Sequence, residues 1–354
     1  MAQRKKSGSA PNVKASKPNE RHVYVVGAGF SAGLGYPLVN DLLIRLWPRL
    51  DSDLREGLQK VVAFHHPGFA ASRATSYPSI ETLLSEMVSN EDLFEASRAA
   101  PGGFTLGALR KVRRGLLLAI VDWFHEIAND YRSAPPTWLT EFAAHVKKTS
   151  ATVISFNWDL VLESLLFDEE SEPNYGLDDS LEGPILVKPH GSLNWFGGRA
   201  ATNIKAEHKH LLHTEGDRAV FRFRHFRAPR GKRSYMPLII PPVSNKRFAR
   251  PIFRDLWRRS VSELSKAGRV TFLGYSLPDA DLHARFILRF GFDNQEQGEL
   301  LPGGKRAAHT GRAITTIVNP DINAARRIEG IVGSACKWKP MFVKDWAETA
   351  LPTA

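Results

Sequence analysis

The chain has 354 residues, of which 43% are hydrophobic and 24% charged, a composition that excludes wholesale disorder and predicts about two domains or one large domain with insertions. Its one cysteine, Cys336, excludes an intramolecular disulfide and a four-cysteine metal site, as is typical of a reducing compartment. The net charge of +11 attracts polyanions, but it does not distinguish nucleic acid from dinucleotide phosphates or from a basic surface without a specific partner.

Residues 1–20 are rich in Lys, Ser, Pro and Asn and have no apolar periodicity, so we expect a disordered basic tail. This tail could contact nucleic acid, although a solvated tail is the interpretation that we favour. No apolar run reaches the ~18 residues that a membrane span needs, and no apolar segment follows the basic N-terminus as a secretory signal requires. These features predict a cytoplasmic protein without membrane association.

A β-branched and aromatic run predicts a first strand at His22–Val26. It ends in the turn Gly27-Ala28-Gly29-Phe30-Ser31, and a helical pattern follows at Leu38–Leu46. Strand, glycine turn and helix in this order are typical of the opening unit of a dinucleotide-binding fold. Residues from about 51 to 148 then show helical periodicity, broken at Pro135-Pro136 with Thr137 as the expected next N-cap, and predict an inserted helical module.

Strands and helices alternate in the rest of the chain. The expected strands are Thr152–Ser155, Ile185–Lys188, Leu238–Ile240, Val270–Leu273 and Ile314–Val318, and the expected helices are Asp159–Phe167, Phe253–Lys266, Asp281–Phe290 and Ile322–Ile328. This alternation predicts an α/β fold of Rossmann type, with a mostly parallel sheet covered on both faces. We therefore expect one domain at 21–354 that carries the helical insertion at about 51–148 and a basic excursion, rich in His and Arg, at about 196–236.

Small or polar residues follow five of these strands, at the edge where open α/β sheets bind ligands. The glycines of the Gly27–Ser31 turn would let the backbone approach a pyrophosphate. Asn157 could hold a water or a ribose hydroxyl, and His190 could act as a general base. Ser276 could bond a phosphate or ribose, and Asn319 the hydroxyls of the adenosine ribose.

Each of these residues also has a structural interpretation. Asn157 could be a turn residue, and His190 could be a structural part of its Pro-His-Gly turn. Asp159 and Asp281 could be helix N-caps. The functional interpretation depends on the convergence of all five segments on one edge of one sheet.

Taken in chain order, the motifs resemble the signature of the sirtuin family over residues from about 22 to 330. That signature runs Gly-Ala-Gly-x-Ser, Asn-x-Asp, His-Gly, Gly-x-Ser and a late Asn. Here it corresponds to Gly27–Ser31, Asn157 with Asp159, His190-Gly191, Gly274 with Ser276, and Asn319. Three further segments resemble the zinc-less bacterial branch, whose members are often NAD hydrolases in antiphage defence: 80–84, 239–242 with Lys246, and 274–281.

The resemblance implies an NAD+ glycohydrolase that cleaves the nicotinamide–ribose bond through an oxocarbenium-like transition state, giving nicotinamide and ADP-ribose or a cyclic isomer. It also implies a homo-oligomer or an activating partner protein. The implied roles are catalysis by Asn157, His190 and Asp159, diphosphate binding by Gly27, Ala28, Gly29 and Ser31, and adenosine binding by Gly274, Ser276 and Asn319.

Several differences from the deacylating sirtuins are visible. The chain lacks their two Cys-x-x-Cys pairs, so we expect no zinc. Leu38-Val39-Asn40 stands where they have Asp-Phe-Arg, and Phe156 where they usually have Gln. These differences disfavour acyl-lysine processing. The alternatives are an NAD-dependent deacylase or ADP-ribosyltransferase and, outside enzymes, an NAD-binding sensor or a DNA-associated scaffold.

Two basic segments have other interpretations. His208, His210 and His213 lack the partner pair that a metal site of recognised spacing needs, so we expect no metal there. The basic run from Arg222 to Arg233 alternates with phenylalanines, which predicts a hairpin strand with one apolar face. For its basic face we favour exposure to solvent or contact with another subunit or a partner protein. Contact with nucleic acid is the alternative.

Overall fold

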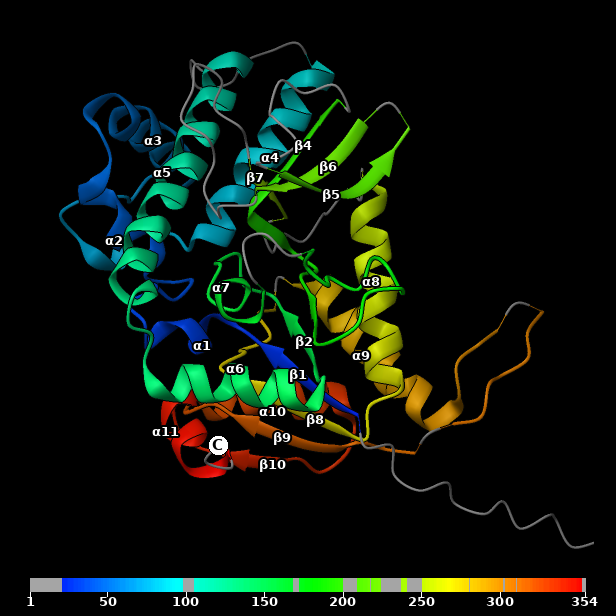
Figure 1. Cartoon of the computed structure of the whole chain (residues 1–354). Coiled ribbons are helices and arrows are strands. Elements are labelled where there is room, and N and C mark those ends of the chain that lie inside the picture. The colour runs from blue at the N-terminus through cyan, green and yellow to red at the C-terminus, as the bar shows by residue number, and fades with distance from the viewer. Residues whose placement is uncertain are drawn as a thin grey trace, which may run out of the picture.

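A six-stranded sheet forms the centre of the computed structural model of the chain (Figure 1), and every neighbouring pair of its strands is parallel. The order across the sheet is β10 (Lys337–Lys339), β9 (Ile314–Val318), β8 (Arg269–Leu273), β1 (His22–Val26), β2 (Thr152–Ser155) and β3 (Ile185–Val187). Renumbered within this sheet alone, the order is 3-2-1-4-5-6, that of Rossmann folds. The predicted α/β fold with a mostly parallel sheet is confirmed.

The structure describes residues 21–97, 105–167, 172–199, 209–216, 218–223, 237–240, 250–279, 281–301, 303–309 and 311–351. The tail expected at 1–20 lies outside these ranges. The basic residues at 224–233, His208 and Lys246 lie outside them as well.

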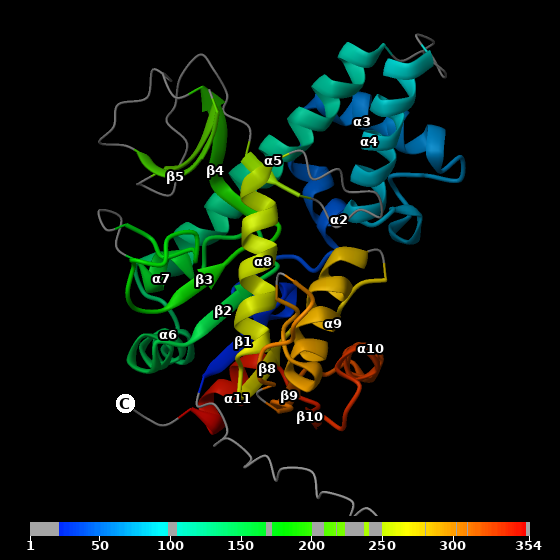
Figure 2. The same cartoon turned by 90° about the vertical axis from the view of Figure 1, so that its right-hand side faces the viewer.

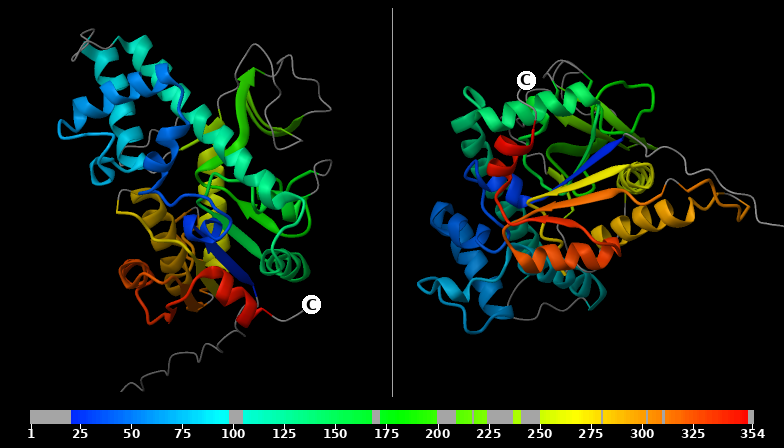
Figure 3. Two further views of the ribbon diagram at one scale, coloured as in Figure 1. Left: turned by 90° about the vertical axis from the view of Figure 1, so that its left-hand side faces the viewer. Right: turned by 90° about the horizontal axis from the view of Figure 1, so that it is seen from below.

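Helices cover both faces of the parallel sheet, as Figures 2 and 3 show. One face carries α6 (Thr137–Thr149) and α11 (Val343–Ala350), and the other carries α8 (Pro251–Ser265), α9 (Leu282–Gln297) and α10 (Ile322–Val332). The central strands are therefore buried on both sides, which explains why Val23–Val26 of β1 and Val153-Ile154 of β2 show no alternation of apolar and polar residues.

A second group of helices lies beyond the carboxyl ends of the strands (Figure 1): α2 (Leu42–Leu46), α3 (Ser52–His65), α4 (Ile80–Ser97) and α5 (Leu106–Arg132). Two short 3₁₀ segments, Trp47–Arg49 and Ala74–Ser76, connect them. The side chains of Asp51 and Thr105 accept hydrogen bonds from backbone N–H groups in the first turns of α3 and α5, as N-caps do. Of these helices, α3, α4 and α5 lie in the range 51–148 where the sequence predicts a helical insertion, whereas α2 precedes that range and α6, which the range also includes, covers the parallel sheet.

Four strands form a small antiparallel sheet, in the order β5 (Lys209–Glu215), β6 (Arg218–Phe223), β4 (Gly191–Arg199) and β7 (Pro237–Ile239). The strand expected at Leu238–Ile240 is thus present, but it belongs to this sheet because it pairs with β4 directly after the His190 loop. The expected solvated basic face is wrong at Arg222. Its side chain is fully buried and lies beside Tyr175, since the small sheet packs this face inward.

Local differences from the expected elements have identifiable causes. The helix expected at Asp159–Phe167 is reduced to α7 (Glu163–Leu166), because the Asp159 side chain accepts a hydrogen bond from the Val161 amide and holds the chain in a turn. The helix expected at Leu38–Leu46 begins only at Leu42, and the expected Gly27–Ser31 turn instead contains a short helix, α1 (Ala28–Ala32). Thr137 is the first helical residue of α6 and not its N-cap, which is Pro136. The exposed strand β10, polar at both ends, was not expected.

Candidate active site

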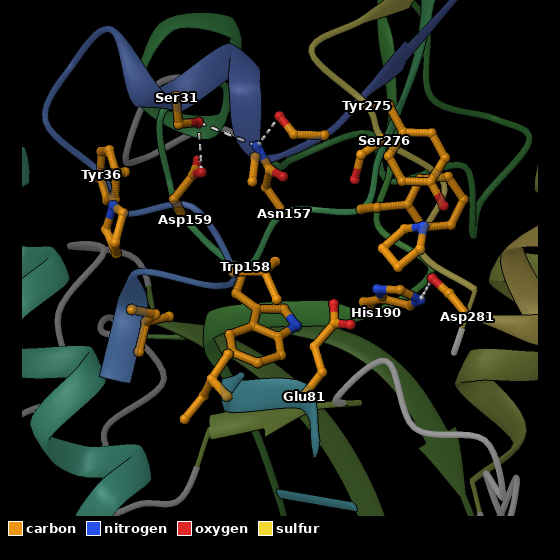
Figure 4. A pocket seen from close by; sticks show the side chains of 18 of the residues that line it. Ser31, Tyr36, Glu81, Asn157, Trp158, Asp159, His190, Tyr275, Ser276 and Asp281 are labelled. Atoms are coloured by element: carbon orange, nitrogen blue, oxygen red, sulfur yellow. Dashed lines mark hydrogen bonds and ion pairs between the residues drawn. The ribbon is translucent and has the colours of Figure 1, made fainter. Parts of the chain in front are cut away.

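A pocket lies at the carboxyl ends of β1, β2 and β8, beside the point where strand order reverses around β1 (Figure 4). It encloses about 730 Å³ between protein atoms, including the part that opens to solvent. Ligands of open α/β sheets bind at such switch points. The residues that line it are Gly27, Ala28, Ser31, Tyr36, Pro37, Val39, Leu42, Ile80, Glu81, Phe124, Phe156, Asn157, Trp158, Asp159, His190, Tyr275, Ser276, Pro278 and Asp281.

A hydrogen-bonded chain joins α1, directly after β1, to the loop after β2 on one side of the pocket. The Ser31 hydroxyl donates to Asp159 Oδ2 at 2.7 Å, and the Asn157 amide Nδ2 donates to Ser31 Oγ at 3.2 Å and to the Gly27 carbonyl at 2.9 Å. All three polar side chains are buried. Because Nδ2 is held in this way, Oδ1 is the atom that Asn157 can offer to a ligand, as a hydrogen-bond acceptor.

An imidazole–carboxylate pair lies on the opposite side. His190 Nε2 is 3.1 Å from Asp281 Oδ2, and both side chains are buried. Asp281 Oδ1 also accepts from the Ala284 amide at 3.2 Å, so this carboxylate caps α9 while it orients the imidazole. The opposite edge of the His190 ring faces the pocket (Figure 4). A carboxylate that holds a histidine in this way is a common arrangement for a general base.

Aromatic rings build the wall next to His190. Phe156 stacks on Tyr275 with ring centroids 4.7 Å apart. The ring centroids of Phe156 and His190 are 5.0 Å apart, and these two rings meet edge to face. Trp158 lines the same pocket. Burial raises the pKa of Tyr275 well above its usual value, and the Asp281 and Glu81 carboxylates raise it further. Tyr275 therefore stays a neutral hydroxyl at physiological pH.

A buried ion pair connects the loops that carry Asp159 and His190. Lys188 Nζ lies 2.6 Å from Glu163 Oε1 and donates to the Asp159 carbonyl at 2.6 Å and to Ser192 Oγ at 2.9 Å. The Lys188 and Glu163 side chains are each only 1% exposed. These contacts hold the two loops in fixed positions relative to each other, although Asp159 and His190 are 31 residues apart in the sequence.

Three glycines allow the start of α1 and the turn after β8 to approach each other closely. The Gly29 amide donates to the Gly274 carbonyl at 2.9 Å. A Cβ atom on Gly274, whose φ is +61°, would lie 2.4 Å from the Gly29 carbonyl carbon, and a Cβ on Gly27 would lie 2.6 Å from Tyr275 Cα. The backbone-to-backbone approach therefore requires glycine here, independently of any ligand.

Most of the predicted site residues come together in this pocket. Its lining includes Gly27, Ala28, Ser31, Asn157, Asp159, His190 and Ser276, whereas Gly29, Gly274 and Asn319 do not belong to it. Asn319 is buried beside it. Its Nδ2 donates to the Tyr275 carbonyl and its Oδ1 accepts from the Asp321 amide, so it fixes the Tyr275 turn.

Sequence reasoning gave no site role to several residues of the lining. Tyr36 is among them, and burial together with the Asp159 carboxylate raises its pKa far above the usual value. Ile80, Glu81 and Phe124 come from α4 and α5 of the helical insertion. The segment 80–84 stands out in the sequence only for its resemblance, and nothing in its helical periodicity indicates which face meets the pocket.

The described residues contain no group of three or more His, Cys, Asp or Glu side chains that could hold a metal ion. His213 Nε2 instead lies 2.9 Å from Asp255 Oδ2, within hydrogen-bonding distance. None of the helices in the described ranges is both long and apolar enough to cross a membrane.

Comparison with known proteins gives similarity to solved Sir2 structures. No family model and no curated protein matches the sequence. A mutant of a Sir2 homologue in complex with ADP-ribose is 13% identical, with a TM-score of 0.44, over 93% of this chain and 89% of that chain. Sir2Tm bound to a propionylated peptide is 13% identical, with a TM-score of 0.38, over 93% and 90%.

Proposed function

We propose that this protein is an NAD+ glycohydrolase that breaks the nicotinamide–ribose bond, with water or a ribose hydroxyl as the acceptor. One observation carries the proposal. Asn157 and the His190–Asp281 pair face a single pocket at the switch point of a 3-2-1-4-5-6 sheet, the place where such sheets bind dinucleotides.

The residues present fit an NAD molecule as substrate. The indole Nε1 of Trp158 and the Tyr275 hydroxyl are buried polar atoms without a hydrogen-bond partner in the described part of the chain, and both residues line the pocket. Buried polar groups are nearly always hydrogen-bonded, so these two atoms are suited to polar groups of a ligand. The apolar side chains of Ile80, Phe124 and Phe156 supply contact area for a ring.

The proposed reaction assigns one task to each polar group. The bond between the ribose C1′ and the nicotinamide nitrogen breaks, and the electron pair leaves with nicotinamide. Asn157 Oδ1 accepts a hydrogen bond from the attacking water or a ribose hydroxyl and aims it at C1′. His190 takes up the proton released by that attack, and Asp281 stabilises the resulting imidazolium. Asp159 and Ser31 hold Asn157, and Ser276 would bind the adenosine half.

The biological setting implied by the sequence resemblance is depletion of NAD in bacterial antiphage defence. The same resemblance implies activation by self-association or by a partner protein. NAD turnover should therefore be assayed over a wide range of protein concentrations.

The test is incubation of the purified protein with NAD, with and without an acyl-lysine peptide, followed by identification of the products. We expect nicotinamide and ADP-ribose, or its cyclic isomer, without the peptide. Asn157→Ala and His190→Ala should abolish release, whereas the exposed-site controls Asn323→Ala and His309→Ala should not. Nicotinamide release that strictly requires the peptide and yields an O-acyl product would identify a deacylase instead. NAD binding without turnover at any protein concentration would identify a sensor.

A further inference from the structure

A second cavity lies at the amino ends of the parallel strands, the opposite end of the sheet from the candidate active site. The first residues of β1, β8, β9 and β10 line it, together with a residue of α11. Strands β8, β9 and β10 lie at the bottom of Figure 1, away from the helical insertion. The cavity encloses about 680 Å³ between protein atoms, including the part that opens to solvent. Its lining residues are His22, Arg269, Thr271, Ile314, Thr316, Lys337 and Trp346.

Helices α6 and α11 cover this face of the sheet at β1. The ring of Tyr24 contacts Phe142 of α6 and Trp346 of α11, with centroids 5.1 Å and 6.4 Å apart. The face continues across β8, β9 and β10, because residues in register on neighbouring strands point to the same side of a sheet. The residues in register with Tyr24 are Thr271, Thr316 and Lys337.

The same face is open over β9 and β10. Ile314 is 54% exposed, Arg269 and Lys337 are exposed, and Thr316 is half-buried. The other face of these strands is closed, as Phe272 shows by packing against α9. Both faces of a doubly wound sheet are normally covered. The open part of this face therefore gives a ligand access to polar side chains of the sheet.

The polar side chains around the opening favour an anion. Among the described residues that line it, Arg269 and Lys337 are cationic and none is a carboxylate. Within the part of the chain that the structure describes, neither cation has an ion pair or a side-chain hydrogen bond. The positive charge extends into the cavity, because burial and then the charges of His145 and Arg269 lower the pKa of His22 to about 4. The imidazole of His22 is therefore neutral at physiological pH and adds no charge of its own.

We propose that this cavity binds a phosphorylated small molecule, with Arg269 and Lys337 on either side of the phosphate. Their backbones are two strands apart and offset by two residues, which separates the Cα atoms by roughly 12 Å. Long side chains span such a distance from both sides, and each cation forms charge-assisted hydrogen bonds with phosphate oxygens. The Thr316 hydroxyl lies on β9 between them and can donate to the same group.

The depth of the cavity favours a small ligand over a nucleic acid. Thr271 and Trp346 line it but are buried, so part of the lining is recessed below the exposed cations. A small molecule reaches this part, whereas a duplex contacts only the rim. The site is separate from the candidate active site, so the inference does not depend on NAD turnover.

The experiment is calorimetric titration of the full-length protein with pyrophosphate at physiological ionic strength. We expect saturable binding that the combined substitutions Arg269→Gln and Lys337→Gln weaken by at least about tenfold. Arg269→Lys, which keeps the charge, should weaken binding less than Arg269→Gln. Both residues are exposed at the first position of a strand, so the variants should fold, and thermal unfolding checks this.

The matched control combines Lys111→Gln and Arg326→Gln. It removes the same charge from exposed positions on α5 and α10, outside the lining of either cavity. Salt screens charges at such distances, so the control should change the affinity by less than about twofold. A wild-type protein without saturable pyrophosphate binding would overturn the inference, and so would equal affinities in the cavity variant and the control. Tighter binding of a DNA or RNA oligonucleotide, lost in the cavity variant, would identify a nucleic-acid surface instead.

Discussion

Asp281→Asn is the sharpest test of the His190–Asp281 pair. The substitution keeps the shape of the side chain and replaces the carboxylate with an amide. Asparagine is as good an N-cap as aspartate, so the bond to the Ala284 amide and the start of α9 should survive. The atom that faces His190 Nε2 would become an N–H donor, which forces the imidazole into the other tautomer and places its proton on the edge that faces the pocket.

The size of the effect follows from the geometry. Unit charges separated by 3.1 Å at an effective dielectric constant of about 20 interact by about 5 kcal/mol. This is an upper bound on what Asp281 contributes to an imidazolium that forms in the transition state, because water and neighbouring dipoles replace part of it. We expect kcat to fall by about 10²–10³-fold, which is about 3–4 kcal/mol, while KM changes by less than about threefold.

Initial rates of nicotinamide release over a range of NAD concentrations separate kcat from KM, and thermal unfolding checks the fold. The matched control is Asp279→Asn in the same turn, whose exposed side chain pairs with Arg285 at 2.7 Å. A folded Asp281→Asn protein that keeps wild-type kcat would refute the assignment of His190 as the base oriented by Asp281. A large rise in KM with unchanged kcat would place Asp281 in substrate binding instead.

Three further predictions concern stability. Lys188→Met should lower the free energy of unfolding by about 3–5 kcal/mol, because it leaves the buried Glu163 carboxylate uncompensated, and Lys188→Met with Glu163→Gln should recover part of that loss in urea denaturation. Gly274→Ala should lower the free energy of unfolding by more than about 2 kcal/mol, because φ is positive at this position and the added Cβ would lie 2.4 Å from Gly29. The control Gly330→Ala, in open space on α10, should stabilise the fold slightly. Equal effects of the two substitutions would contradict the close-approach argument. Burial, and to a smaller extent the charges of His145 and Arg269, lower the pKa of His22 from 6.5 to about 4. Between these pH values the unfolded chain takes up a proton that the folded chain does not, so the free energy of unfolding should fall as pH drops from 6.5 toward 4. His22→Gln should flatten that part of the stability profile, and a variant with the wild-type slope would show that another group is responsible.

The sequence alone was sufficient where local signals agree. The strands β1, β2 and β9 were predicted with their observed bounds, because their runs of β-branched and aromatic residues end in clear turn signals. Parallel strands place their carboxyl ends at one edge of a sheet, so the alternating pattern by itself predicts that the segments after them meet there. Asn157, Asp159 and His190 do line one pocket for this reason.

Tertiary structure alone decided which residues complete that pocket. Helical periodicity shows that α4 and α5 have an apolar face, but it cannot show that Glu81 and Phe124 meet the ends of β1 and β2, since that depends on how two distant segments pack. The same holds for Arg222, which reads as a solvated position on an alternating strand and is buried, and for Asp281, which caps a helix and also orients His190. A local pattern specifies the conformation of a segment, whereas the partners of a buried charge are set by contacts between segments far apart in the chain.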